Sequence, residues 1–134
     1  MVNTSTRTNI AGGKSSIVGF VVAGTRSRWV LVRAVGPGLK SFGVPTYLSD
    51  PKLEIFGAAG VHYTATGWKA LASDPDHQAC LVAIMDFLGA FPLATDSDDA
   101  VYFVQLPPGV YSVVCSSTSG TKEGEVLTEV YLLP

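Results

Sequence analysis

Apolar and polar residues alternate along most of the chain in short runs. β-Branched and aromatic residues dominate these runs, and clusters rich in Gly, Pro, Ser and Asp separate them. This pattern is typical of half-buried strands that are joined by tight turns. Only residues 57–60 separate the third run from the fourth, which predicts a hairpin. In all, seven runs predict strands, at residues 15–22, 28–35, 52–56, 61–66, 100–106, 110–115 and 125–132.

One segment has a different period. Between residues 76 and 88 the spacing of the apolar residues fits a short helix. Residues 73–76 supply a capping residue, a proline that the first turn tolerates, and early acidic charge. Gly89 is placed to end the helix. The sequence therefore predicts one helix near residues 75–88.

Several short strands with regular turns and one helix predict a mostly β fold, namely an antiparallel, jelly-roll-like β-sandwich. The length of 134 residues suits a single domain spanning 1–134. Hydrophobic residues make up 47% of the chain and charged residues 15%, which is too apolar for a disordered chain. The sequence thus predicts one folded domain with its own core.

Charge and hydropathy argue against two classes of partner. The net charge of −2, with no basic stripe, argues against binding to nucleic acid. No apolar run approaches the roughly 18 to 20 residues that a membrane span needs, so no membrane insertion is expected. The first residues lack the zones of a signal peptide. If the protein is exported, its signal lies outside this sequence or has been removed.

The two cysteines, Cys80 and Cys115, fit no metal-binding or CxxC spacing. They can form one disulfide in an oxidising compartment, or they can remain two buried thiols. Because unpaired cysteine is among the most buried residue types, the sequence favours free thiols.

No catalytic constellation stands out. The Gly-Gly-Lys-Ser stretch at residues 12–15 is similar to the end of a phosphate-binding loop, but Thr8 stands where that motif needs another Gly. An ordinary turn is the simpler interpretation. His62 lies in a predicted strand and is expected to face solvent. His77 is a candidate metal ligand or general base, although the acidic helix start beside it needs no ligand to explain it. The sequence predicts no catalytic residue and no enzyme.

The best candidate metal site is the acidic loop with Asp96, Asp98 and Asp99. Three carboxylates in four residues offer the hard oxygen ligands that Ca²⁺ prefers. The EF-hand pattern is absent, however, and a solvated loop that enters the next strand explains the same residues. Calcium is the one cofactor that the sequence suggests.

Aromatic residues suggest a second kind of site. Tyr63 and Trp68 flank a stretch rich in Thr and Gly, and aromatic rings of this kind can stack on sugars. Simple packing is the alternative. Trp29 stands in a strongly apolar run and is predicted to be core. Arg33, a single charge in the same run, is predicted to be a paired structural residue.

Motifs in a fixed order run along nearly the whole chain. They comprise Val-Leu-Val-Arg-Ala-Val-Gly-Pro-Gly-Leu at 30–39, Leu-Ser-Asp-Pro-Lys-Leu-Glu-Ile-Phe at 48–56, Gly-Ala-Phe-Pro-Leu at 89–93, Leu-Pro-Pro-Gly-Val-Tyr at 106–111 and Glu-Val-Tyr at 129–131. This order resembles a domain repeated in large secreted proteins of environmental bacteria, and it is similar to the bacterial pre-peptidase C-terminal domains.

The resemblance implies a non-catalytic β-sandwich that is appended to secreted enzymes or surface proteins. Some members of that family bind calcium or polysaccharide. The chain departs from the family at residues 64–68, Thr-Ala-Thr-Gly-Trp, where an Asn/Asp-rich stretch usually precedes the Trp. This departure removes expected calcium ligands there.

Three functions follow as hypotheses. The first is a non-catalytic module of a secreted or cell-surface bacterial protein, which binds or spaces and has other domains of that protein as partners. The second is a self-assembling structural subunit whose copies pair through edge strands, either at residues 2–8 or at the apolar last strand. The third is a lectin-like module that binds polysaccharide through Tyr63, Trp68 and the acidic loop.

Overall fold

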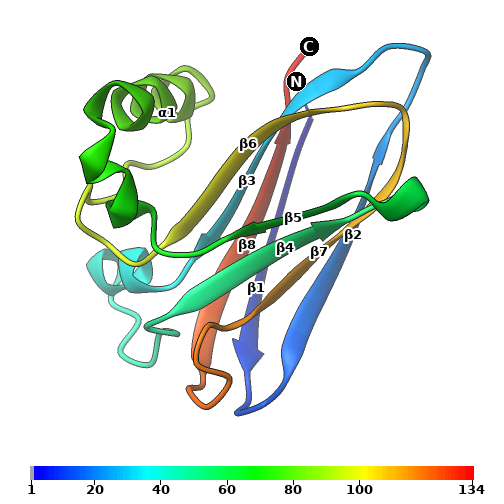
Figure 1. Ribbon diagram of the computed structural model, residues 1–134. Coiled ribbons are helices and arrows are strands. Elements are labelled where there is room, and N and C mark those ends of the chain that lie inside the picture. Colours follow the sequence, from blue (N-terminus) through cyan, green and yellow to red (C-terminus); the bar gives the residue numbers. More distant parts are fainter. Residues whose placement is uncertain (1) are drawn as a thin grey trace.

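The computed structural model describes residues 2–134 and shows a sandwich of two four-stranded antiparallel sheets (Figure 1). Its elements are β1 (Val2–Ile10), β2 (Ser15–Val22), β3 (Arg28–Val35), β4 (Pro51–Phe56), β5 (His62–Ala65), α1 (Pro75–Phe87), β6 (Ala100–Leu106), β7 (Gly109–Ser117) and β8 (Gly124–Leu132). Short 3₁₀ helices lie at Pro37–Phe42, Ala58–Gly60 and Trp68–Ser73. Among these residues, no helix is long and apolar enough to cross a membrane.

The strand order is that of a jelly roll. One sheet has the order β1-β8-β3-β6, and the other has the order β2-β7-β4-β5. Strand pairs β1–β8, β2–β7, β3–β6 and β4–β5 are all antiparallel, so the chain is a long hairpin wrapped around itself into two layers. The predicted jelly-roll-like sandwich is confirmed.

All seven predicted strands are present. The structure adds an eighth, β1, which the sequence pattern did not predict. Residues 2–8 were expected to form an edge that pairs between copies, and they do form an edge strand, but it pairs with β8 of the same chain. The last strand, β8, was proposed as an alternative edge. This proposal is wrong, because β8 lies between β1 and β3 and both of its sides are paired.

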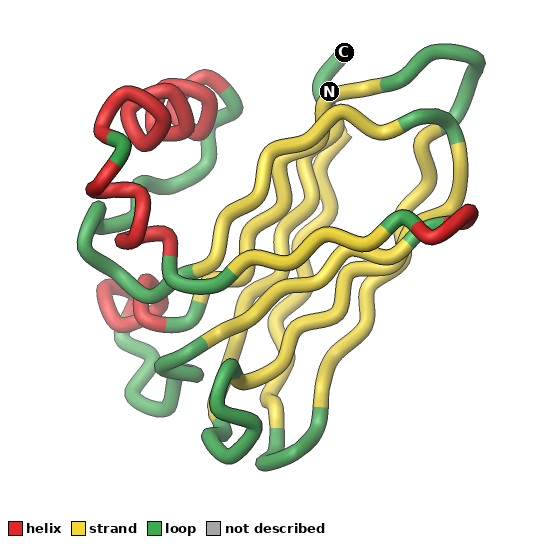
Figure 2. Tube along the Cα trace, viewed as in Figure 1, coloured by secondary structure: helices red, strands yellow, loops and turns green. Residues whose placement is uncertain are grey.

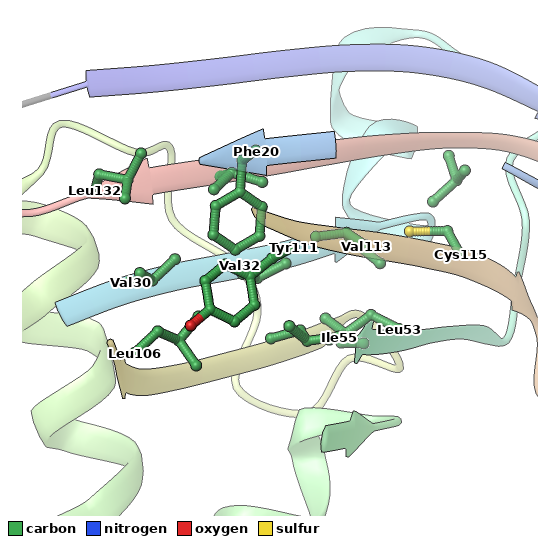
Figure 3. Packing of buried hydrophobic residues seen from close by; sticks show 14 of the residues in the cluster. Phe20, Val30, Val32, Leu53, Ile55, Leu106, Tyr111, Val113, Cys115 and Leu132 are labelled. Atoms are coloured by element: carbon green, nitrogen blue, oxygen red, sulfur yellow. The ribbon is translucent and has the colours of Figure 1, made fainter. Parts of the chain in front are cut away.

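The main core fills the space between the two sheets. Figure 3 shows Phe20 and Tyr111 at its centre, and their rings stack with centroids 5.3 Å apart. The Tyr111 hydroxyl donates a hydrogen bond to the Pro107 carbonyl oxygen at 2.5 Å. Gly109 adopts a φ of 158°, which few other residues tolerate. The Leu-Pro-Pro-Gly-Val-Tyr motif is therefore a turn that its own tyrosine fixes to the core.

A second core lies on the outer face of the β1-β8-β3-β6 sheet, beneath α1 and the loops around it. Leu81 and Met85 of α1 pack there against Leu31 and Val35 of β3. β3 is therefore buried on both faces, which explains its nearly unbroken apolar run. The predicted helix is confirmed.

The outer face of the other sheet carries no helical layer. Figure 2 shows the helical segments gathered on one side of the sandwich, apart from the short turn at 58–60. Ile17, Val21 and Val110 are 57–70% exposed on this bare face. β2 accordingly keeps a clean alternation of buried and exposed residues.

Candidate functional site

The structure brings Trp68 and Asp99 together, but in the interior. Ser97 joins them: its hydroxyl accepts a hydrogen bond from the Trp68 indole Nε1 at 3.2 Å and donates one to Asp99 Oδ2 at 2.7 Å. The same indole nitrogen also donates to the Ala94 carbonyl oxygen at 3.0 Å. This network fixes the loop before β6 to the 3₁₀ helix at Trp68–Ser73.

Asp99 uses its other carboxylate oxygen to hold the loop after β3. Oδ1 accepts hydrogen bonds from the backbone N–H groups of Gly36 and Gly38 at 2.8 and 3.1 Å, and the residue is fully buried. An added side chain at Gly38 would approach Asp99 Oδ2 to 3.1 Å, so the glycine permits this close contact. The Gly-Pro-Gly motif is thus anchored by a carboxylate that lies more than sixty residues away in the sequence.

The acidic loop does not converge on a metal position. Asp99 faces backbone donors, Asp98 pairs with Lys69 at 2.9 Å between Oδ1 and Nζ, and Asp96 is exposed. Within residues 2–134, no group of three or more His, Cys, Asp or Glu side chains is placed to hold a metal ion. Calcium binding by Asp96, Asp98 and Asp99 stays a prediction, and the geometry gives Asp99 a structural role.

Tyr63 and Trp68 do not form an exposed aromatic platform, so this predicted sugar site is corrected. Trp68 is 2% exposed, because the loop before β6 and the second core enclose its ring. Tyr63 points into the sandwich instead and packs against Tyr102 with ring centroids 5.3 Å apart. Neither ring offers an open face for stacking as the sequence suggested.

A cleft of about 300 Å³ opens beside these residues, between the free edges of β5 and β6 and the start of α1. Residues 64–66 line one wall, and residues 101–103 line the other. Trp68, Leu71, His77 and Leu81 contribute the remaining surface. The volume is at the lower end of the range for ligand pockets, about 300 to 1,000 Å³. This cleft is the candidate binding site.

The cleft is largely aromatic and aliphatic, and its lining carries no carboxylate, ammonium or guanidinium group. Its polar side chains are the hydroxyls of Thr64, Thr66 and Tyr102, together with the imidazole of His77. Burial, and to a smaller extent the nearby Tyr63, raises the pKa of Tyr102 above its ordinary value. The Tyr102 hydroxyl therefore keeps its proton at neutral pH and can donate a hydrogen bond to a ligand.

The two histidines lie apart. His62 is exposed on β5, as predicted, with its Nε2 2.9 Å from Glu54 Oε2 and its ring stacked on Phe56. His77 is exposed in the first turn of α1, where its backbone N–H donates to Asp74 Oδ1 at 3.3 Å. Asp74 is therefore a helix cap, while the His77 side chain lines the cleft.

Arg33 forms the buried pair that the sequence predicted. Its Nη2 lies 2.6 Å from Glu129 Oε1, and its Nη1 donates to the Phe91 carbonyl oxygen at 2.7 Å. Tyr131 donates to the second oxygen of Glu129 at 2.8 Å. Burial, together with the hydrogen bond to Glu129, raises the pKa of Tyr131 to about 12. These side chains lie under α1, so they support the second core.

Trp29 was predicted to be core and is instead 45% exposed, stacked on Phe103 with centroids 4.8 Å apart. It stands at the start of β3, where the helical layer no longer covers the sheet. The cysteines are free, as the sequence favoured, with Cys115 buried and Cys80 exposed rather than buried. Burial raises the pKa of the Cys115 thiol to about 11.

Sequence reasoning missed Tyr102 and Phe103 as candidate site residues. Both belong to a strand whose pattern is that of ordinary core, and only its position at a sheet edge leaves both side chains half-buried. Adjacent residues of a strand point to opposite faces, so a cleft that both side chains line must run along the strand edge. No sequence signal marks an edge of this kind.

Comparison with known proteins gives similarity in structure alone. The sequence matches no model of a protein family and no curated protein. The pre-peptidase C-terminal domain of collagenase from Bacillus anthracis superimposes with a TM-score of 0.55 and 11% identity, over 97% of this chain and 90% of that one. CBM35 from Cellvibrio japonicus Abf62 superimposes with a TM-score of 0.44 and 15% identity, over 95% and 70%. The fold is thus a β-sandwich similar to that of a pre-peptidase C-terminal domain, the likeness that the motif order predicted.

Proposed function

We propose that the chain is a non-catalytic binding module of a secreted or cell-surface bacterial protein, and that its ligand enters the cleft between β5, β6 and α1. One observation carries this proposal. The cleft combines aromatic and aliphatic walls with a few convergent polar groups, which is the usual make-up of a ligand site. The lining side chains include one imidazole and no carboxylate, serine or cysteine, a composition that suits binding better than catalysis.

A ligand screen by nuclear magnetic resonance tests this function. We expect members of a small-molecule and glycan library to shift the amide signals of residues 64–66 and 101–103. Tyr102→Ala should weaken those shifts. Phe87→Ala, which removes an exposed ring outside the cleft lining, is the matched control and should leave them unchanged. If no library member shifts the cleft signals, the proposal is wrong.

A second candidate function, self-assembly, is favoured by one observation. β1 is nine residues long and stands at a sheet edge, and within residues 2–134 no strand pairs with its outer side. Unprotected edges of this kind pair readily between copies. Light scattering across a concentration series tests it: the wild-type chain should form oligomers, and Thr4→Lys with Thr6→Lys should abolish them. A wild-type chain that stays monomeric at high concentration rules out this function.

A further inference from the structure

We infer that α1 carries a docking surface for another protein, and that the segment which docks there is a short helix with apolar residues and at least one Lys or Arg. The surface consists of a groove between α1 and the loop that follows it, together with the exposed ring of Phe87. Together they form the α1 surface. It is separate from the cleft between β5, β6 and α1, because the residues that line the two hollows do not overlap.

The groove is an apolar hollow with one carboxylate. Its volume is about 290 Å³. Residues of α1 between 79 and 86 line one wall, and residues of the following loop between 90 and 93 line the other. Ala79 and Ala83 are neighbours on one side of the helix, and their short side chains leave room there. Every lining residue except Asp86 is apolar.

The apolar surface continues beyond the groove. Phe87 is 79% exposed, the largest exposed fraction among the large apolar side chains of residues 2–134, and Val82 is 41% exposed. The opposite side of α1, with Leu81 and Met85, packs in the second core. α1 is therefore apolar on two sides, and a helix that is apolar all round is normally buried. Within the described chain, only one of these two sides is covered.

Charge decides which partner can cover the other side. Asp86 is exposed, and within residues 2–134 its carboxylate makes no ion pair. It stands in the last turn of α1, where a cation stabilises a helix and an anion does not. Arg33 contacts Met85 at 3.3 Å, but it is buried and its charge is paired with Glu129. A partner that brings Lys or Arg to Asp86 therefore supplies a positive charge that α1 itself lacks.

The same distribution of charge argues against other occupants. A second copy that docks through its own α1 would bring another acidic helix without Lys or Arg. An anionic lipid surface attracts amphipathic helices that are rich in Lys and Arg, and α1 has neither. A small cation would fill the groove but leave the Phe87 ring exposed. A protein segment with both apolar and basic residues complements the whole surface.

The dimensions of the α1 surface fit a short helix. From Ala79 to Phe87 an α-helix rises about 12 Å, at 1.5 Å per residue. A helix that docks in a groove uses anchors at i, i+3 or i+4, and i+7, which span about 10 Å. An extended segment has nothing to pair with here, because the backbone groups of a helix bond to one another. The docked segment is thus a helix of about two to three turns.

Two synthetic helical peptides, added to the full chain, test the inference. Both carry Leu at every third or fourth position, and they differ only in the flanking residues, which are Lys in one and Glu in the other. Fluorescence anisotropy gives the affinity, and amide shifts locate the binding. We expect the Leu–Lys peptide to bind and to shift the signals of residues 79–93. The Leu–Glu peptide should bind at least about 10-fold more weakly.

Variants of Asp86 test the charge. Asp86→Asn should weaken binding of the Leu–Lys peptide about 3- to 10-fold, and Asp86→Lys should reverse the preference in favour of the Leu–Glu peptide. Glu123→Gln removes an exposed carboxylate from the loop between β7 and β8, outside the groove, and is the matched control. It should leave the affinity unchanged. If Glu123→Gln weakens binding as much as Asp86→Asn, the peptide responds only to the overall negative charge and the inference is wrong.

A second pair of variants tests the apolar contact. Phe87→Ala removes the most exposed ring of the α1 surface and should lower the affinity for the Leu–Lys peptide about 10-fold. Ile17→Ala, which shortens an exposed side chain on the bare face of the other sheet, is the matched control and should have no effect. Circular dichroism confirms that each variant is folded. Equal losses from Phe87→Ala and Ile17→Ala would show that the peptide adheres to any apolar patch.

Three further outcomes would overturn the inference. If neither peptide shifts the signals of residues 79–93, the α1 surface does not dock a helix. If n-butylguanidinium, which has the head and stem of an Arg side chain, binds in the groove and the Leu–Lys peptide does not, the occupant is a small cation. If light scattering shows that the chain alone forms a dimer and Phe87→Ala abolishes it, the occupant is a second copy.

Discussion

Arg33 and Glu129 face each other on neighbouring strands, β3 and β8, and their side chains meet at 2.6 Å beneath α1. Both residues are buried, with Arg33 wholly inaccessible to solvent. The guanidinium also stands over the Phe91 ring, with its carbon 4.4 Å from the ring centroid. Each charged group of the pair is hydrogen-bonded, so neither charge is left unpaired in the core. The hydrogen bond from Arg33 to the Phe91 carbonyl oxygen also fixes the loop before β6 against the sheet.

Loss of either member of this pair should destabilise the fold strongly. We expect Arg33→Met or Glu129→Met to lower the free energy of unfolding by about 3 to 5 kcal/mol, because the partner is left unpaired in the core. The double variant Arg33→Met with Glu129→Met should lose much less than the two single losses combined. Urea unfolding followed by circular dichroism measures all of these values. Additive losses would show that the two side chains do not interact.

The two tryptophans should differ sharply in their contribution to the stability of the fold. Trp68→Ala removes a buried ring whose single N–H is shared between the Ala94 carbonyl oxygen and the Ser97 hydroxyl, and should cost about 3 to 5 kcal/mol of stability. Trp29→Ala removes a half-exposed ring and should cost less than about 1.5 kcal/mol. Chemical unfolding of both variants checks the difference. Equal losses would contradict the assignment of Trp68 to the second core.

Asp50 should make stability depend on acid pH. Burial raises its pKa, but hydrogen bonds from Ser119 and Ser117 and the charge of Lys122 lower it more, so the pKa lies below the ordinary value of 3.8. A depressed carboxyl pKa means that its contribution is present above about pH 4 and is lost as the pH falls through the folded-state pKa.

The variant Asp50→Asn tests this dependence. At pH 7 it should be less stable than the wild-type chain by about 1 kcal/mol, since the carboxylate is partly exposed and water screens it. As the pH falls below 4, the difference between the two proteins should shrink. A difference that stays constant between pH 7 and pH 2.5 would show that the charge of Asp50 plays no part.

The two thiols should react at very different rates. Cys115 is buried, contacts Thr128 Oγ1 at 3.1 Å, and has a pKa of about 11, so almost no thiolate forms at pH 8. Cys80 is exposed on α1. We expect a thiol reagent at pH 8 to modify one cysteine quickly in the folded protein and both in urea. With Cys80→Ser, the fast phase should disappear; a fast phase that remains would place Cys115 at the surface.

Most of the fold could be predicted because its signals are local in the sequence: apolar alternation, bounding turns and a helix-capping residue. β2, β3 and β6 span the residues that their apolar alternation and bounding turns predict. α1 begins after its capping Asp74 and is followed by Gly89, whose φ is 74°. β1 could not be recognised in this way, because its Thr, Ser and Asn residues show no apolar face. It is a strand because β8 offers it a row of hydrogen bonds.

The candidate site depends on contacts that a local pattern does not record. Sequence spacing predicted Trp29 as core, and it left Trp68 open between a sugar-stacking ring and simple packing; the structure exposes Trp29 and buries Trp68. The reason is physical: burial is decided by what a distant segment lays over a side chain. Trp68 is enclosed by a loop 26 and 29 residues further on, and Trp29 lies past the end of the helical cover.

The sequence by itself determined seven of the eight strands, the helix, the paired role of Arg33 and the order of motifs that predicts the sandwich. Only the tertiary structure decided which strands stand at the edges, and therefore where a ligand can enter. β5 and β6 are separated in the chain by α1 and its loops, yet the wrapping of the jelly roll places their free edges opposite each other. The local apolar pattern determines that a segment forms a strand. Which strands lie beside it is determined by how the whole chain buries its apolar surface.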